Sequence, residues 1–146
     1  MFVKVTNGQT SKYPYTLGEL RRENPNISFS KVIPEGTLAE YGVYKVEPRT
    51  APKFDNKTHS MLETVENLNG VWTQRWVQKK LPTDRASANV RRHRDQLLAE
   101  TDWIVIKSYE RGENISAEWV LYRQDLRDIT AQAGFPYNVI WPTKPE

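Results

Sequence analysis

Histidines and carboxylates are the side chains most often used for acid–base chemistry, and in this chain they form no motif typical of a catalytic site. The two histidines are His59 and His93, and His93 lies on the apolar side of a predicted helix beside a run of arginines. A structural histidine is more common there than a general base. Asp125 and Asp128 share a helix face, but exposed carboxylates of this kind are usually solvated charge. There is no HExxH, GxSxG or phosphate-binding loop and no paired metal ligands, so we expect no enzyme activity, cofactor or metal.

A second group of residues, Trp72, Arg75 and Trp76, has the types that bind other macromolecules. Tryptophan and arginine are enriched at protein hot spots, and the same residues can stack on single-stranded bases. Tryptophan in a small domain is nevertheless most often a core residue. We expect one of the two tryptophans to contact a protein partner, together with Arg75, Tyr13 and Tyr15.

Composition narrows the classes of protein further. The chain has 146 residues, no cysteine and a net charge of +3, which is weaker and less focused than in most nucleic-acid binders. The absence of cysteine excludes a disulfide framework. The N-terminus lacks a signal-peptide pattern, and no stretch approaches the length of a membrane span. We therefore expect a soluble intracellular protein.

The first 82 residues predict short strands and turns. Residues 2–5 alternate like a strand that ends at Asn7-Gly8, residues 17–24 form a short helix capped by Thr16, residues 34–40 form a helical turn, and residues 41–46 form a strand. The clearest signal is Asn69-Gly70 between residues 59–68 and 71–80, which predicts a hairpin with a type I′ turn. Both faces of this hairpin are mixed in polarity, which indicates partial cover on both sides.

No proline occurs between Pro82 and Pro136, so uninterrupted helices belong in this interval. Thr83 and Ser116 are the predicted N-caps of two helices. The helix faces are predicted from the spacing of Ala86, Val90, His93 and Leu97 in the first, and of Trp119, Tyr122, Leu126 and Ile129 in the second. The apolar tail from Phe135 to Pro142 is predicted to run extended and to pack back on these helices. A tail exchanged between subunits is the alternative.

Three phrases in residues 94–103, 119–129 and 134–142 resemble, in their order and aromatic anchors, the C-terminal module of phage tail-assembly chaperones. The resemblance covers residues 83–142 and implies a protein-binding helper that assists tail fibres to fold and trimerise. It implies a core or assembly role for Trp103, Trp119, Tyr122, Leu126, Phe135 and Trp141. Its charged positions are Arg94, Asp95, Arg123 and Arg127, and it implies partners between helices or subunits for Arg123 and Arg127. Where the family has a polar loop between its helices, this chain has the apolar residues 103–109, which predict a strand or an extra contact surface.

Together these observations predict an α+β protein with a β-rich, sandwich-like, client-binding domain at residues 1–82 and a helical chaperone module at residues 83–146. The predicted client is the distal part of a phage tail fibre. The resemblance implies that the chaperone acts as a homotrimer on the trimeric fibre, as a late viral protein in the host cytoplasm. The alternatives are a minor structural component of the tail, which would stay in the virion, and a nucleic-acid-binding module.

Overall fold

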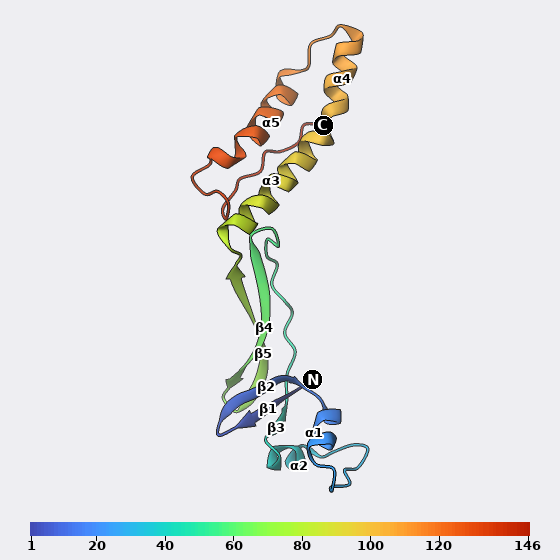
Figure 1. Ribbon diagram of the computed structural model, residues 1–146, viewed down its shortest axis with the longest axis vertical. Helices are drawn as coiled ribbons and strands as arrows, with labels where there is room; N and C mark the ends of the chain where they lie inside the picture. Colours follow the sequence, from blue (N-terminus) through green and yellow to red (C-terminus); the bar gives the residue numbers. More distant parts are fainter. The chain divides into compact units, whose positions relative to one another are not determined.

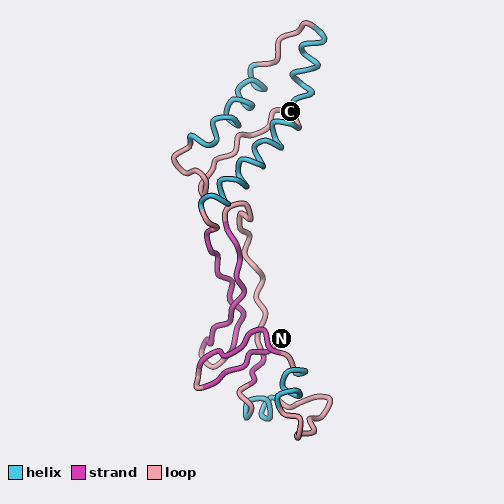
Figure 2. The backbone as a smooth tube through the Cα atoms, in the orientation of Figure 1, coloured by secondary structure: helices cyan, strands magenta, loops and turns pink.

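A computed structural model describes residues 1–146 and has the predicted α+β class (Figure 1). Strands lie in the first part of the chain and helices dominate the second, as Figure 2 shows by colour. The chain forms two compact units: residues 1–53 with 61–78, and residues 54–60 with 79–146. The division into functional domains at residue 82 stays a prediction, because compactness alone does not show which parts fold independently.

The first unit contains a three-stranded antiparallel sheet in the order β2-β1-β3. Strands β1 (Phe2–Thr6) and β2 (Gln9–Tyr15) are joined by Asn7 and Gly8, whose φ angles are 53° and 75°. Both turn residues have positive φ, as a type I′ hairpin turn requires. Strand β1 was predicted, whereas β2 was not, because its mostly polar, exposed residues show no alternation of apolar side chains.

Helix α1 (Leu17–Glu23) follows directly and begins at the predicted cap. Thr16 Oγ1 accepts a hydrogen bond from the Glu19 backbone nitrogen at 3.2 Å, and the Glu19 carboxylate accepts one from the Thr16 backbone nitrogen at 2.8 Å. Lys12 lies 2.6 Å from the same carboxylate. The hydrogen bonds from Lys12 and then Thr16 lower the pKa of Glu19 to about 2. The carboxylate is therefore charged at neutral pH, as this reciprocal cap requires.

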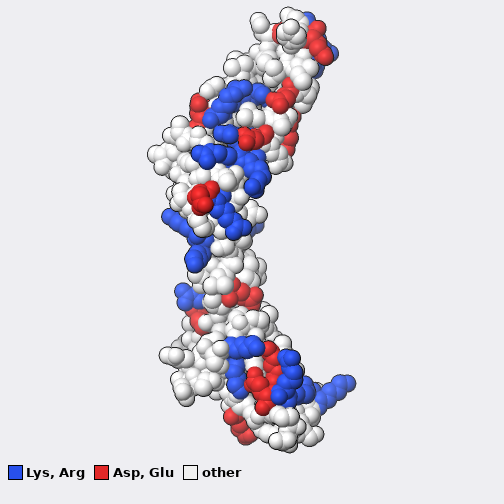
Figure 3. All heavy atoms as spheres, viewed as in Figure 1, with Lys and Arg blue, Asp and Glu red and all other residues white.

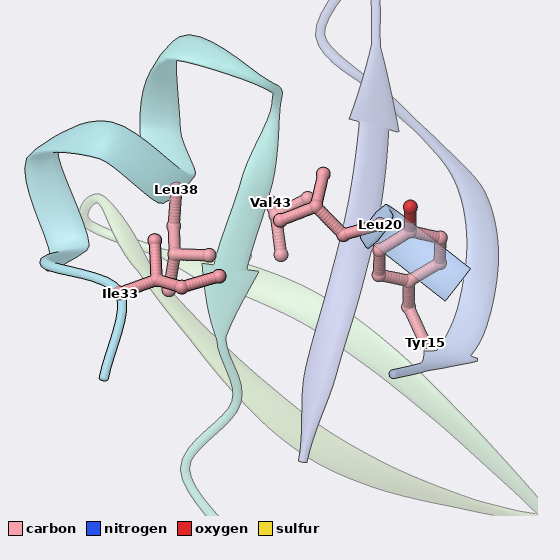
Figure 4. Close-up of a cluster of buried hydrophobic side chains, with 5 residues drawn as sticks. All are labelled: Tyr15, Leu20, Ile33, Leu38 and Val43. Atoms are coloured by element: carbon pink, nitrogen blue, oxygen red, sulfur yellow. The ribbon is translucent and has the colours of Figure 1, made fainter. Parts of the chain in front are cut away.

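Helix α2 (Glu35–Glu40) and strand β3 (Val43–Lys45) confirm the predicted helical turn and strand. Gly42, with a φ of 66°, connects them and places β3 beside β1. Residues of β2, α1, α2 and β3, together with Ile33 just before α2, form the core in Figure 4, which consists of Tyr15, Leu20, Ile33, Leu38 and Val43.

Strands β4 (His59–Leu68) and β5 (Val71–Lys80) form the predicted hairpin as a separate two-stranded sheet. Asn69 and Gly70 have φ angles of 53° and 89°, which confirms the predicted turn. Thr64 Oγ1 donates to the Arg75 carbonyl oxygen at 3.3 Å, in keeping with the predicted pairing of these residues. In the first unit, the hairpin packs on the other sheet through a core of Val3, Val46 and Trp72 with Val65 beside it.

The second unit contains three helices, α3 (Thr83–Ala99), α4 (Asp102–Arg111) and α5 (Ala117–Arg127), followed by the 3₁₀ turn η1 (Asp128–Ala131). The two predicted helices are confirmed, although neither Thr83 nor Ser116 forms a side-chain cap. Pro82 occupies the N-cap of α3, so Thr83 is its first helical residue. Ser116 precedes α5 without a capping hydrogen bond from its side chain.

Residues 103–109, for which a strand was one of two predicted alternatives, lie in helix α4, so the strand alternative is wrong. The segment is apolar and β-branched, but its ends carry helix signals: Asp102 lies in the first turn, Arg111 in the last, and Gly112 follows with a φ of 66°. An acidic start, a basic end and a left-handed glycine cap all favour a helix. These signals outweigh the β-propensity of the run, because β-propensity depends strongly on context.

The C-terminal tail turns before it extends, which corrects the prediction of an extended backbone from Phe135. Residues 133–137 form a turn that contains a cis Phe135–Pro136 peptide bond, and the Asn138 nitrogen donates to the Gly134 carbonyl oxygen at 2.7 Å. A Cβ atom on Gly134 would overlap the Asn138 carbonyl oxygen, so the turn has no room for a side chain there. The tail then packs back on the helices, as predicted.

Candidate functional site

Two of the predicted partner-contact residues, Tyr15 and Trp72, are core residues. Tyr15 is buried in the core of the first unit, and its hydroxyl donates to Glu23 at 2.6 Å. Burial and this carboxylate raise the pKa of Tyr15. Trp72 is only 9% exposed and packs between the two sheets. Neither side chain offers a broad surface to a partner, which disagrees with the prediction for Tyr15 and leaves Trp76 as the candidate of the two tryptophans.

The other candidates, Tyr13 and Trp76, are half-buried and joined by a chain of hydrogen bonds. The Tyr13 hydroxyl donates to the Glu63 carboxylate, which also accepts from Gln74 Nε2 at 2.7 Å. Gln74 Oε1 accepts from the Arg49 backbone nitrogen at 2.9 Å, and Trp76 Nε1 donates to the Arg49 carbonyl oxygen at 2.8 Å. Burial, and then the bond to Glu63, raise the pKa of Tyr13 to about 12, so it remains a donor at neutral pH.

Arg75 is exposed and is the candidate with the freest side chain. Its guanidinium lies 3.6 Å from Glu66, which also pairs with Arg49 at 3.3 Å. Neighbouring β-strand residues point to opposite faces, so Arg75 and Trp76 do not form one patch. The hairpin therefore presents an arginine on one face and a fixed, half-buried tryptophan on the other.

The first unit contains a pocket of about 620 Å³. It lies between β3 and the tip of the hairpin, and its lining includes Leu38, Tyr44, Val71 and the remaining accessible part of Trp72. Glu35, Lys45 and Glu47 bring charge to its wall. This concave surface was not predicted, because it depends on how β3 and the hairpin tip meet.

In the second unit, the aromatic anchors of the resemblance gather in one core, with one exception. Tyr122 and Leu126 are buried, and Trp119, Phe135 and Trp141 are partly buried against them. Trp103 is 59% exposed on α4, so its assignment to the core was wrong. A role for Trp103 in assembly stays a prediction.

His93 lies in contact with this core, where a structural histidine was predicted. Its ring is 4.7 Å from that of Trp141 in an edge-to-face arrangement. Burial and the charge of Lys57 lower the pKa of His93, although Asp55 and Glu100 act in the opposite sense. A lowered pKa favours the neutral imidazole at neutral pH, which suits packing against an indole ring.

The predicted charged positions of the module have different environments. Arg94 pairs with its neighbour Asp95, with Nη2 2.7 Å from the Asp95 carboxylate. Arg91, four residues before Asp95, lies over the Phe135 ring at 5.5 Å. Arg127 is exposed. Among these residues, Arg123 alone makes contacts with other helices.

Arg123 is buried on α5 and joins the end of α3 to the start of α4. Its Nη1 donates to the Leu98 carbonyl oxygen at 2.9 Å and to Thr101 Oγ1 at 2.5 Å, and its Nη2 donates to Asp102 Oδ1 at 2.7 Å. The last carbonyl groups of a helix have no partner within the helix, and a cation is favourable there. One side chain thus stabilises the junction of three helices.

We expect Arg123→Met to lower the free energy of unfolding of the second unit by about 1–3 kcal/mol, because buried acceptors lose a charged donor. Arg127→Met, on the exposed face of the same helix, should cost about 0.5 kcal/mol. Denaturant unfolding followed by circular dichroism measures both. Equal losses in the two variants would show that the Arg123 contacts do not stabilise the junction.

Exposed apolar side chains on α5 were not predicted, whereas those on α4 lie in residues 103–109, where an extra contact surface was one of the predicted alternatives. Ile106 and Tyr109 join Trp103 on the exposed surface of α4, and Val120 and Leu121 are exposed on α5. No residue of α4 is buried. The run of apolar residues 103–106 indicates such a surface, since the run is too rich in apolar residues for a helix with one covered face.

Charge is mixed on the face of the molecule drawn in Figure 3. In both parts of the view in Figure 3, basic side chains lie beside acidic ones and form no single basic stripe. No group of three or more His, Cys, Asp or Glu side chains is placed to hold a metal ion. No helix combines the length and apolar character that crossing a membrane requires. A mixed surface does not favour the nucleic-acid alternative, which requires a focused positive charge.

Comparison with known proteins supports the resemblance found in the sequence. Residues 87–146 match the model of the family described as phage tail assembly chaperone protein. Searches of curated proteins and of solved structures gave no significant match. The match includes the α5 core, the Arg123 junction and the folded-back tail. Residues 87–146 of this chain are therefore similar to the phage tail assembly chaperone family.

Proposed function

We propose that this protein binds a phage tail fibre subunit and assists its folding and trimeric assembly. The family match of residues 87–146, which indicates a chaperone role in tail assembly, carries this proposal. Fibres of this kind are intertwined trimers, so their strand edges are exposed until all chains meet. A protein that covers such edges needs a binding surface and no catalytic groups.

We place client contacts on both faces of the hairpin in the first unit, at Arg75 on one face and at Trp76 with Tyr13 on the other. Trp76 is held by the bond from its indole nitrogen to the Arg49 carbonyl, and Tyr13 by its bond to Glu63. Side chains fixed before binding lose less conformational entropy when the partner arrives. Tryptophan, tyrosine and arginine are also the residues that contribute most at protein interfaces.

The test is co-expression of the protein with its fibre subunit, followed by co-purification. We expect Arg75→Ala and Trp76→Ala to leave the melting of the free protein cooperative and to weaken fibre binding about thirtyfold, the effect of losing about 2 kcal/mol at a hot spot. Light scattering of the unmodified complex should give three chaperone chains on three fibre chains, since closed symmetry is the rule for assemblies.

Arg22→Ala is the matched control, because Arg22 is an exposed arginine of the same unit on α1, away from the hairpin in sequence. It should bind the fibre normally. Normal binding by both hairpin variants would contradict the placement of the client surface, and one chaperone chain per fibre trimer would contradict the symmetric complex. No co-purification of the unmodified protein would contradict the fibre as client.

A further inference from the structure

The outer edge of β4 has no backbone partner in this chain. The sheet has two strands, so β4 and β5 each have a neighbour on one side. On β5 part of the other side is occupied: the Glu47 nitrogen donates to the Trp72 carbonyl oxygen at 2.9 Å, and the Gln74 nitrogen donates to the Glu47 carbonyl oxygen at 2.8 Å. On β4, residues 61–68 form no backbone hydrogen bond with any segment outside the hairpin.

The turn determines which backbone groups face outward on this edge. In a two-residue hairpin, the flanking residues Leu68 and Val71 exchange hydrogen bonds, and bonded and non-bonded pairs then alternate along the strands. Trp72 and Gln74 fall in non-bonded pairs, and their outward bonds to Glu47 agree with this alternation. On β4, the residues whose N–H and C=O groups point away from β5 are therefore Met61, Glu63, Val65 and Asn67.

We propose that two copies of this chain pair through the outer edges of β4, antiparallel about a twofold axis at Val65. This pairing forms one four-stranded sheet. The two Val65 residues exchange a pair of backbone hydrogen bonds, and Glu63 of each copy exchanges a pair with Asn67 of the other. The interface is isologous, because one strand meets its own copy.

The side chains favour this register. Pairing about Val65 places Leu62 of each copy opposite Leu68 of the other, and these are exposed apolar side chains, at 56% and 41%. It also places Thr64 opposite Glu66, a polar pair without repulsion. Apolar residues opposite each other across strands stabilise a sheet, and like charges opposite each other destabilise it.

Other twofold registers are less favourable. An axis at Glu63 or at Glu66 places two identical carboxylates opposite each other. An axis at Thr64 places Leu62 opposite Glu66 and leaves Leu68 without an apolar partner. An axis between two residues would align outward-facing backbone groups with inward-facing ones, which cannot form the ladder. The register at Val65 alone covers both leucines and avoids repulsion.

The inference concerns the free protein and does not rest on a fibre client. A long exposed edge strand with apolar side chains tends to pair with another chain unless it is protected. A two-stranded hairpin is also marginally stable alone, and added strands stabilise it. Self-pairing gives this edge a defined partner.

Cysteine cross-linking tests the register, because the chain contains no cysteine. Leu62 and Leu68 of the second copy form a non-bonded pair, with Cα atoms about 4.5 Å apart, which is within the range of a disulfide. The double variant Leu62→Cys/Leu68→Cys should form a disulfide-linked dimer under mild oxidation. A mixture of the two single variants should cross-link to each other more strongly than either does to itself. The register would be overturned if each single variant cross-linked with itself as strongly as the two variants cross-link in the mixture.

Charge substitution tests the dimer itself by sedimentation equilibrium. We expect the free protein to be a dimer, Leu62→Lys to weaken it about tenfold, and Leu62→Lys/Leu68→Glu to restore it through the opposite charges. Val71→Lys is the matched control, since Val71 is an exposed apolar residue on β5, and it should leave dimerisation unchanged. A free protein that is monomeric or trimeric, or a Leu62→Lys variant as tightly dimeric as the unmodified protein, would overturn the proposal.

Discussion

Leu126→Ala should lower the free energy of unfolding of the second unit by about 2–5 kcal/mol, whereas Leu121→Ala should change it by less than about 0.5 kcal/mol. Both residues lie on α5, and the substitution removes the same atoms. Leu126 is 0% exposed, and Leu121 is 61% exposed. The difference between the variants therefore measures burial rather than helix propensity.

The expected loss at Leu126 is large because its core is small. The fully or nearly fully buried residues of this core are Val90, Tyr122, Leu126 and Ile129, with partly buried aromatic side chains around them. A cavity at the centre of four residues has few neighbours that can move in to fill it, so the cost of the cavity adds to the lost transfer free energy. A small domain also has little stability to lose.

Denaturant unfolding followed by circular dichroism, with amide hydrogen exchange over residues 117–131, measures this loss in the second unit. Leu126→Ala should bring exchange of the α5 amides close to the rate of an unfolded chain at moderate denaturant. Leu121→Ala should keep the unmodified pattern. Similar protection in the two variants would mean that the α5 face is assigned wrongly.

Local patterns in the sequence predicted the parts of the fold that depend on neighbouring residues. The Asn69-Gly70 turn, the reciprocal cap of Thr16 and the apolar face of α5 all follow from residues a few positions apart. The same kind of signal was present at Asn7-Gly8, but it was interpreted only as the end of a strand. Reading it as a turn with two positive φ angles would have predicted β2.

Burial was harder to predict, because it depends on contacts between distant parts of the chain. Trp72 and Trp76 have the same type and share a strand face, yet Trp72 packs between two sheets and Trp76 is only half-buried. Arg123 and Arg127 form a comparable pair, of which only Arg123 reaches the ends of two other helices. Strand and helix periodicity identify a face, but the packing partner of that face is set by the rest of the fold.

In residues 103–109, the type of element was harder to predict than its exposure. Their composition predicted a strand, while the acidic and glycine residues at the two ends specified a helix. The resulting helix buries none of its residues and leaves Trp103, Ile106 and Tyr109 exposed. The strand alternative is therefore wrong, and the extra contact surface in this segment stays a prediction.

Gly42→Ala should lower the free energy of unfolding of the first unit by about 3 kcal/mol, from the combined effects of backbone strain and a steric clash. Gly42 has a φ of 66°, and a Cβ atom there would overlap the Val5 carbonyl oxygen. The Val5 nitrogen also donates to the Gly42 carbonyl oxygen at 2.7 Å. Relief of the clash must therefore separate β1 from the residue that leads into β3.

Gly8→Ala is the matched control for this prediction, because Gly8 lies in the same unit with a φ of 75°, and a Cβ atom added there would meet no other atom within 4 Å. Its cost is that of positive φ alone, about 1–2 kcal/mol. Chemical unfolding of both variants, with exchange of the β1 amides as a local probe, separates the strain from the clash. Equal losses at Gly8 and Gly42 would show that β1 and β3 lie further apart at Gly42 than the structure places them. A larger loss at Gly42, with β1 amides exposed first, is the expected result, because only that substitution drives a methyl group into the backbone of the central strand.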